Sequence, residues 1–214
     1  MSAVLARGLA QRFGSRVALF PMDLEVASGE KLAVLGGNGA GKTTLLRMLA
    51  TAARPASGSL QLLGRDALRE RTELRRRIGY LAHEPGLYPN LTALENLRFF
   101  CSLRGLPGAR ATETLRLFGL QQDANRPAAE LSRGRRQRLA LARSLLHEPE
   151  LWVLDEPDSS LDAPGRALLL ELMSGRTAVI ATHDAQLAAQ LCTRSLTLEE
   201  GRLVAGPSLE VLSG

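Results

Sequence analysis

A glycine-rich run around a lysine and a threonine is the part of this sequence best suited to chemistry. The run consists of Gly36, Gly37, Asn38, Gly39, Ala40, Gly41, Lys42, Thr43 and Thr44. Its G-x-x-x-x-G-K-T spacing is typical of a phosphate-binding loop, in which backbone N–H groups surround the phosphates and a following helix adds partial positive charge. We therefore expect Lys42 to reach the β and γ phosphates of a nucleotide and the Thr43 hydroxyl to bind Mg²⁺.

Two adjacent carboxylates follow an apolar segment much later in the chain. Asp155 and Glu156 come directly after Leu151–Leu154, which predicts a buried strand that delivers both acids to one end of a sheet. Together with the phosphate-binding loop, this pair predicts nucleotide hydrolysis. Asp155 would hold Mg²⁺, and Glu156 would polarise the attacking water.

The composition favours an ordinary globular domain. Of 214 residues, 45% are hydrophobic and 23% charged, with a net charge of +5 carried mostly by arginine. No apolar run approaches the roughly 20 residues that cross a bilayer. We expect Cys101 and Cys192 to be buried apolar residues. The low aromatic content of 4% argues against single-stranded nucleic acid as a partner, and we expect none. The arginine cluster at 69–77 is interpreted as a solvated surface.

Segments with strand and helix patterns alternate along the chain, which predicts a mostly parallel sheet covered on both faces. Two opening strands are expected within 4–20, with a turn at Gly14–Ser15, and a hairpin is expected at 194–204. Further strands are expected at 31–35, 58–63, 151–154 and 177–181, and helices at 41–52, 92–104, 109–118, 135–146 and 164–173. The helix at 92–104 opens with a Thr-Ala-Leu-Glu capping box.

Three further motifs give the chain a resemblance to the ABC ATPases. Leu131 to Gln137 reads Leu-Ser-Arg-Gly-Arg-Arg-Gln, Ser159 to Asp162 reads Ser-Ser-Leu-Asp, and Ala181 to Asp184 reads Ala-Thr-His-Asp. They resemble the signature, the D-loop and the switch-histidine loop of that family, and they occur in family order. The resemblance covers essentially the whole chain. It implies a single domain, 1–214, of the α/β P-loop NTPase type, with a parallel sheet flanked by helices, an antiparallel β portion and a helical subdomain at about 84–150.

The same resemblance implies a division of labour between two copies. ATP, with Mg²⁺, would lie between the phosphate-binding loop of one protomer and the signature of another, to which Ser132, Arg133, Gly134 and Gln137 belong. Glu156, Lys42 and His183 would be catalytic, and Asp162 would link the two sites. Phe13 matches the aromatic residue that stacks on adenine, although packing in the core explains it equally well.

Two positions depart from the family pattern. Arg133 replaces a glycine of the signature, and we expect hydrolysis to be retained. His83 replaces a glutamine that contacts Mg²⁺ or water and relays the nucleotide state to a membrane partner, so His83 is a candidate coupling residue and a candidate Mg²⁺ ligand. Histidine can accept or donate a hydrogen bond there.

The loop around His83 and the Leu-Trp-Val-Leu-Asp-Glu-Pro run at Leu151–Pro157 are similar to those of the ATPases of cytochrome c maturation. This narrower resemblance implies a haem-export subunit, a homodimer bound to integral membrane subunits at the cytoplasmic face of the inner membrane. The alternatives are another small exporter ATPase, for a drug, lipid or polysaccharide, a soluble ABC protein that acts on ribosomes or nucleic acid, and a nucleotide-gated regulator with little hydrolysis, which only Arg133 suggests.

Overall fold

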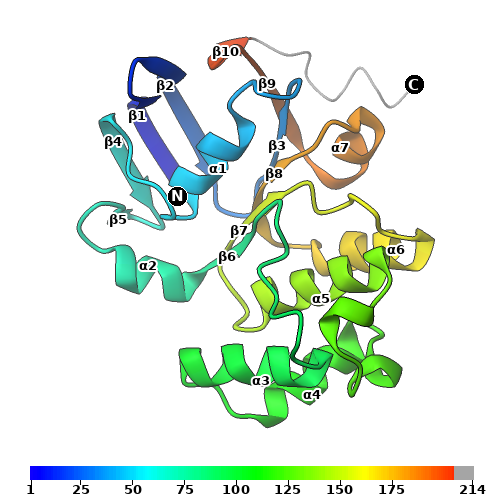
Figure 1. The fold of residues 1–214 in the computed structure, drawn as a ribbon. Coiled ribbons are helices and arrows are strands. Elements are labelled where there is room, and N and C mark those ends of the chain that lie inside the picture. The colour runs from blue at the N-terminus through cyan, green and yellow to red at the C-terminus, as the bar shows by residue number, and fades with distance from the viewer. Residues whose placement is uncertain (205–214) are drawn as a thin grey trace.

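Two β-sheets and the helices around them make up the structure, a computed structural model that describes residues 1–204 (Figure 1). The smaller sheet is antiparallel and has the strand order β2-β1-β4-β5. Its strands are β1 (Ser2–Phe13), β2 (Arg16–Ala27), β4 (Ser57–Leu62) and β5 (Arg65–Asp66). The antiparallel portion expected from the sequence is therefore confirmed, with the turn between β1 and β2 at Gly14–Ser15 as predicted.

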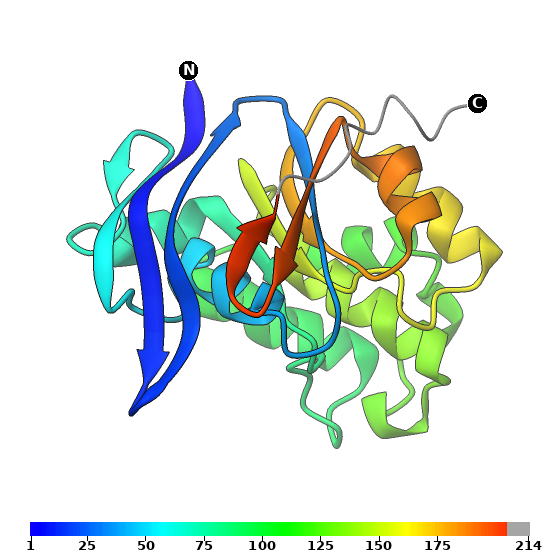
Figure 2. The same ribbon diagram turned by 90° about the horizontal axis from the view of Figure 1, so that it is seen from above.

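The larger sheet has the strand order β10-β9-β3-β8-β7-β6. All of its neighbouring strands are parallel except β10 and β9, which form an antiparallel hairpin. Its strands are β3 (Lys31–Leu35), β6 (Ile78–Leu81), β7 (Leu151–Asp155), β8 (Thr177–Ala181), β9 (Arg194–Glu199) and β10 (Arg202–Val204). The hairpin, red in Figure 2, extends the sheet beyond β3, with which β9 pairs.

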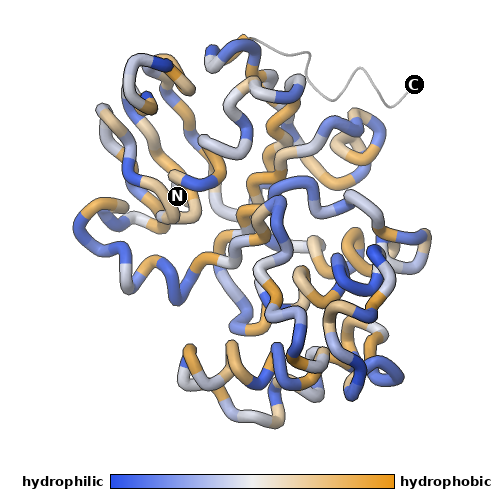
Figure 3. The backbone as a smooth tube through the Cα atoms, in the orientation of Figure 1, coloured by the Kyte–Doolittle hydropathy of each residue, from blue (hydrophilic) through white to orange (hydrophobic). Residues whose placement is uncertain are grey.

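Both faces of the larger sheet are buried, because alternate residues of each central strand enter two different apolar cores. Leu151 and Val153 pack with the smaller sheet, whereas Trp152 and Leu154 pack with the helices of the opposite face. This arrangement explains why the strands are apolar at nearly every position. The hydropathy colouring of Figure 3 shows the apolar strands running through the centre of the molecule.

The helix that follows the phosphate-binding loop, α1 (Lys42–Leu49), lies between the two sheets and contacts β7, β8 and β2. The opposite face is covered by α5 (Arg133–Leu145), α6 (Ala163–Leu172) and α7 (Ala185–Leu191). The short helix α2 (Arg71–Arg77) precedes β6. Because β3 and β7 are parallel members of one sheet, their carboxyl ends bring the phosphate-binding loop and the Asp155–Glu156 pair to the same edge.

Between β6 and β7 the chain is largely helical. This stretch contains α3 (Ala93–Arg104), α4 (Ala109–Leu117), α5 and two short 3₁₀ turns at Gln121–Asp123 and Ala128–Glu130. The capping box of α3 forms as expected, since Thr92 accepts from the Glu95 amide and the Glu95 side chain accepts from the Thr92 amide. These helices share one apolar core with the larger sheet. A separate helical subdomain at about 84–150 remains a prediction.

Candidate active site

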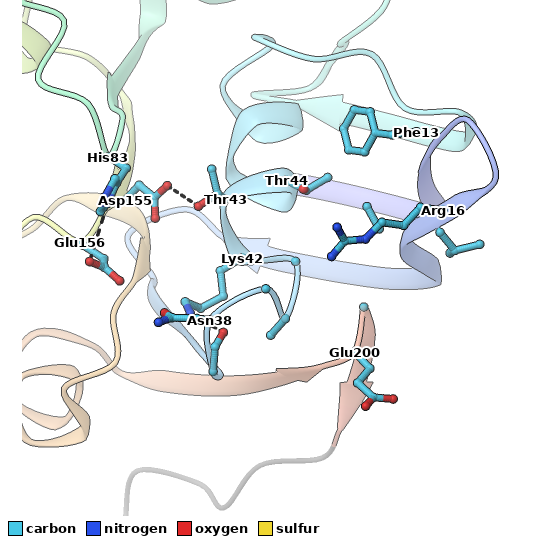
Figure 4. A pocket seen from close by; sticks show the side chains of 17 residues that line it. Phe13, Arg16, Asn38, Lys42, Thr43, Thr44, His83, Asp155, Glu156 and Glu200 are labelled. Carbon is cyan, nitrogen blue, oxygen red and sulfur yellow. Dashed lines mark hydrogen bonds and ion pairs between the residues drawn. The ribbon is translucent and has the colours of Figure 1, made fainter.

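A cavity of about 610 Å³ opens at the carboxyl ends of β3 and β7. Figure 4 shows that elements distant in the sequence line it: the phosphate-binding loop, the ends of β1 and β2, and the tip of the β9–β10 hairpin. Its lining includes Gly37–Thr44, Phe13, His83, Asp155 and Glu156. The structure thus places most of the predicted nucleotide-binding residues around one cavity, whose volume suits a nucleotide.

The glycines of the loop are required by its backbone path. Gly41 caps α1 with a φ of 106°, and a Cβ there would lie 2.7 Å from the Leu19 side chain. Gly36 has a φ of 145°, and a Cβ there would lie 2.3 Å from the Leu198 carbonyl oxygen. Neither position accommodates a side chain. The glycines therefore allow the loop to curl at the amino end of α1 beside the cavity, and a helix amino end with free backbone N–H groups suits an anion.

Lys42 is nearly buried and lies along the loop. Its Nζ donates to the carbonyl oxygens of Gly36, at 2.7 Å, and Gly37, at 3.0 Å. These bonds hold the ammonium group close to the curled backbone. A triphosphate seated in the loop would lie within reach of this charge, so the arrangement can bind the β and γ phosphates.

Thr43 and Asp155 provide neighbouring oxygen atoms for a cation. The Thr43 hydroxyl donates to Asp155 Oδ2 at 2.7 Å, and Asp155 is 2% exposed. Burial raises the pKa of Asp155, and the nearby Glu156 carboxylate adds to this rise. A divalent cation would stabilise the ionised carboxylate. Residues 1–204 contain no cluster of three or more His, Cys, Asp or Glu side chains able to hold a metal by themselves, and Mg²⁺ usually takes its remaining ligands from phosphates and water. Thr43 and Asp155 therefore fit Mg²⁺ bound together with a nucleotide.

The Glu156 carboxylate lies between two histidines. His183 Nδ1 is 3.4 Å from Glu156 Oε1, and His83 Nδ1 is 3.8 Å from Oε2. Glu156 adopts a φ of 49° directly after β7, and its amide donates to the carbonyl oxygen of Ala181 at the end of β8. This turn fixes the carboxylate beside Asp155, where it can accept a proton from an attacking water. His83 therefore contacts Glu156 in this structure, and its predicted role as a Mg²⁺ ligand stays a prediction.

The signature residues lie away from the cavity. Ser132 caps α5 by accepting from the Arg135 amide at 3.3 Å, and Arg133 is exposed at the first position of the helix. Gly134 packs so closely on the next motif that a Cβ would lie 2.9 Å from the Ser160 carbonyl oxygen. None of these three residues lines the cavity. Within one chain, then, the signature does not meet the phosphate-binding loop.

Gln137 makes contacts within its own chain. It is 8% exposed and donates to the carbonyl oxygens of Glu156 and Pro157, both at 3.3 Å. It therefore lies on the face of α5 that packs against the end of β7, and its predicted contact to a second copy, as part of the signature, stays a prediction. It positions the backbone of Glu156.

Arg138 is a site residue that the sequence reasoning missed. It donates to Asp162 Oδ2 at 2.8 Å, while Asp162 Oδ1 accepts from the Gly165 amide and caps α6. This contact joins the signature helix to the loop that contains Asp162. In the sequence Arg138 is one of four arginines between positions 133 and 138, and its pairing with Asp162 depends on the tertiary fold.

Comparison with known proteins gives a consistent result. A family profile described as "ABC transporter" matches residues 19–159. The chain is 42% identical over 189 residues to the cytochrome c biogenesis ATP-binding export protein CcmA of Xanthomonas axonopodis pv. citri, covering 84% of this chain and 86% of that protein. It is 36% identical to the Nod factor export ATP-binding protein I of Cupriavidus metallidurans, covering 96% of this chain and 71% of that protein.

Another relative and a solved structure agree with this assignment. The daunorubicin resistance ATP-binding protein DrrA3 of Streptomyces coeruleorubidus is 38% identical, and the match covers 95% of this chain and 67% of that protein. The chain thus spans about two thirds of the length of some relatives. A dimeric ATP-binding cassette solved in a post-hydrolysis state with ADP and Pi has a TM-score of 0.87 and 28% identity, over 96% of this chain and 98% of that chain.

Proposed function

The chain belongs to the ABC transporter family as an ATP-hydrolysing domain, and we propose that it powers haem export or the release of a haem carrier in cytochrome c biogenesis. The site supports hydrolysis because it places a candidate general base, Glu156, beside the Thr43–Asp155 pair that fits Mg²⁺. Bound Mg²⁺ would neutralise charge on the phosphates. Lys42 would hold the phosphates, Glu156 would take the proton of the attacking water, and His183 would orient that water and the γ-phosphate.

Two copies are needed to complete this site. Ser132 and Gly134 lie at the amino end of α5, where a helix can bind an anion, yet they do not line the cavity of their own chain. A head-to-tail homodimer would bring them to the γ-phosphate of the partner's ATP. ATP then favours the closed dimer, because only that state makes both sets of contacts. A solved relative of the same fold is itself a dimer, which supports this arrangement.

The observation that carries the haem assignment is sequence similarity together with the loop around His83. Identity to the cytochrome c biogenesis protein is 42%, compared with 36–38% for the Nod factor and daunorubicin proteins. The matches to the Nod factor and daunorubicin proteins support a second candidate, the ATPase of another small exporter for a drug, lipid or polysaccharide, because they cover 95–96% of this chain. The ATP chemistry is the same in both cases, and only the membrane subunits and the cargo differ.

The loop that follows His83 is the proposed surface for the membrane subunits. Tyr88 is 46% exposed and packs edge-on against Phe99, with ring centroids 4.8 Å apart. Beside it lies a cavity of about 400 Å³ that Arg104 and Arg143 line. Apolar rings next to guanidinium groups would suit a partner helix with apolar and acidic side chains.

This surface would hold the chain at the cytoplasmic face of the inner membrane. No helix within residues 1–204 is long and apolar enough to cross a bilayer, so attachment would depend on the membrane subunits.

The test is affinity purification of the tagged chain from detergent-solubilised membranes of its own host, with the recovered membrane proteins identified by mass spectrometry. Recovery of haem-handling membrane proteins supports the proposal, provided that a tagged Tyr88→Glu variant recovers fewer of them. A tagged Leu103→Glu variant, changed at an exposed position of α3, serves as the matched control. Recovery of a different exporter's membrane subunit contradicts the haem assignment, and recovery of ribosomes or nucleic acid alone contradicts the transporter assignment.

A further inference from the structure

Arg16 places a second positive charge in the nucleotide cavity, in addition to that of Lys42. It is the first residue of β2 and lines the same cavity as Phe13 and the phosphate-binding loop. Figure 4 shows its guanidinium group directed toward that loop, between Phe13 and Lys42 in this view. Neither the sequence motifs nor the family resemblance assigns a role to this side chain.

The position of Arg16 relative to Phe13 is fixed by the backbone. The two residues are direct partners across the β1–β2 hairpin, which closes through Gly14 with a φ of 59°. The same hairpin strand also packs on the loop, because Leu19 touches the position where a Gly41 side chain would begin. Arg16 is therefore presented by a framework that contacts both the proposed base-stacking residue and the phosphate-binding loop.

The guanidinium group of Arg16 has no hydrogen bond or ion pair with any side chain or carbonyl in the described part of the chain. Glu200, which lines the cavity from the tip of the β9–β10 hairpin, does not pair with it either. Lys42, in contrast, is bound to two loop carbonyls. Arg16 is thus a free cation beside a cavity built for a polyanion, and arginine suits the bidentate recognition of phosphate oxygens.

The order of the lining residues indicates which phosphate Arg16 would meet. A nucleotide with its base on Phe13 and its β and γ phosphates at Lys42 spans the cavity, so its ribose and α-phosphate lie between them. Resting on the proposed mode of nucleotide binding, we propose that Arg16 binds the α-phosphate oxygens and so contributes equally to the affinity for ATP and ADP. By this account Arg16 also slows the release of ADP after hydrolysis.

A contact between Arg16 and the α-phosphate predicts how the affinities for ATP, ADP and adenosine change when Arg16 is replaced. The α-phosphate is common to ATP and ADP, whereas the signature residues and His183 would act on the γ-phosphate alone. Loss of Arg16 should therefore weaken both nucleotides by the same factor. We expect about five- to tenfold, because a charge-assisted contact is weakened by the solvent at an exposed position. Adenosine, which has no phosphate, should be unaffected.

The test is isothermal titration calorimetry of the purified chain with Mg-ADP, Mg-ATP and adenosine, with ATP titrated in the Glu156→Gln background so that it is not consumed. Arg16→Ala should raise the Kd of ADP and ATP by the same five- to tenfold factor, and Arg16→Lys should restore part of the affinity. Arg12→Ala is the matched control, since it removes an exposed arginine of the same hairpin that does not line the cavity. That control should change neither Kd by more than about twofold.

Three outcomes overturn the proposal. If Arg16→Ala leaves the Kd of ADP unchanged, Arg16 does not bind the α-phosphate. If only the affinity for ATP falls, Arg16 binds the γ-phosphate instead. If the affinity for adenosine falls by the same factor, Arg16 contacts the base or the ribose. A melting temperature equal to that of the unaltered chain shows that Arg16→Ala is folded. Lys42→Ala tests the nucleotide site independently of Arg16. If Lys42→Ala binds ATP with unchanged affinity, the proposed nucleotide site is wrong; if it loses affinity while Arg16→Ala does not, only the role of Arg16 is wrong.

Discussion

His83 lies close enough to Glu156 to influence hydrolysis, and replacing it by alanine measures how much. The two side chains approach to 3.8 Å, between His83 Nδ1 and Glu156 Oε2, and the imidazole is 70% exposed. An exposed contact of this kind contributes less than about 1 kcal/mol. If all of it acted on the transition state, turnover would fall by about fivefold at most.

A larger loss is expected if His83 has another role. Removing a general acid or base lowers the rate by about 10² to 10⁴, and loss of a metal ligand would also weaken Mg-ATP binding. We expect His83→Ala to bind ATP with nearly unchanged affinity and to hydrolyse it within fivefold of the original rate. In membranes that contain the partner subunits, the same variant should hydrolyse ATP but lose most of its transport.

The assay is steady-state phosphate release at several ATP concentrations, together with direct measurement of ATP affinity. His83→Gln serves as the matched control, because it restores the residue usual in the family and should retain both hydrolysis and transport. A hundredfold fall in kcat for His83→Ala would contradict the relay interpretation and make His83 a catalytic residue. An ATP affinity that is lower in the variant than in the unaltered chain with Mg²⁺ present, but equal in the two when EDTA removes Mg²⁺, would make His83 a metal ligand.

Three other perturbations follow from the geometry. Gly41→Ala should lower the unfolding free energy by about 2 kcal/mol and abolish ATP binding, because its Cβ would lie 2.7 Å from Leu19, whereas Gly37→Ala, which meets no atom within 4 Å, should melt normally. Burial raises the pKa of Asp155 in the folded chain. Ionisation of Asp155 therefore destabilises the folded state, and this cost grows as the pH rises from the pKa of the unfolded chain to the higher pKa of the folded one. Asp155→Asn should consequently raise the melting temperature of the nucleotide-free protein at pH 7 while abolishing Mg-dependent hydrolysis. Burial also lowers the pKa of His147 to about 4, from 6.5, so the unfolded state takes up the proton first, and stability should fall by about 2 kcal/mol between pH 6.5 and 4, after allowance for partial exposure. Denaturant titrations at several pH values measure this dependence. If the unfolding free energy of His147→Gln falls as much between pH 6.5 and 4 as that of the unaltered chain, His147 is not the group responsible.

The parts of the fold with strong local signals could be predicted from the sequence. The strand at Lys31–Leu35 and the glycine-rich loop after it lie where expected, since a buried parallel strand and a phosphate-binding loop each have a distinctive pattern. The helix at Ala93–Arg104 was predicted from its capping box, which needs only neighbouring residues. Local chemistry was sufficient in these cases.

The sequence analysis did not predict α2, β5, β6 or α7. For α2 and β6 the reason is that their stability depends on distant residues. The helix at Arg71–Arg77 buries only Leu74, so its arginines suggested a solvated surface rather than a helix. The strand at Ile78–Leu81 has four residues and pairs with Leu151–Leu154. No short segment by itself indicates such a pairing.

The candidate site shows the same division between local and tertiary signals. The motifs identified Lys42, Thr43 and Asp155, and the structure brings all three to one cavity. They did not reveal that Gln137 supports the backbone of Glu156, or that Arg138 binds Asp162. These contacts join α5 to loops that follow it in the sequence, and spacing alone does not show which face of the helix each residue occupies.

Hydrolysis of ATP in this cavity with Glu156 as the base is best tested by comparing the turnover of purified Glu156→Gln with that of the unaltered protein. We expect Mg-dependent phosphate release by the unaltered chain, and a fall of about 10² to 10⁴ in the variant with ATP affinity preserved. Turnover that survives in Glu156→Gln, or an unaltered chain that binds ATP without hydrolysing it, would rule out Glu156 as the base of an ATPase.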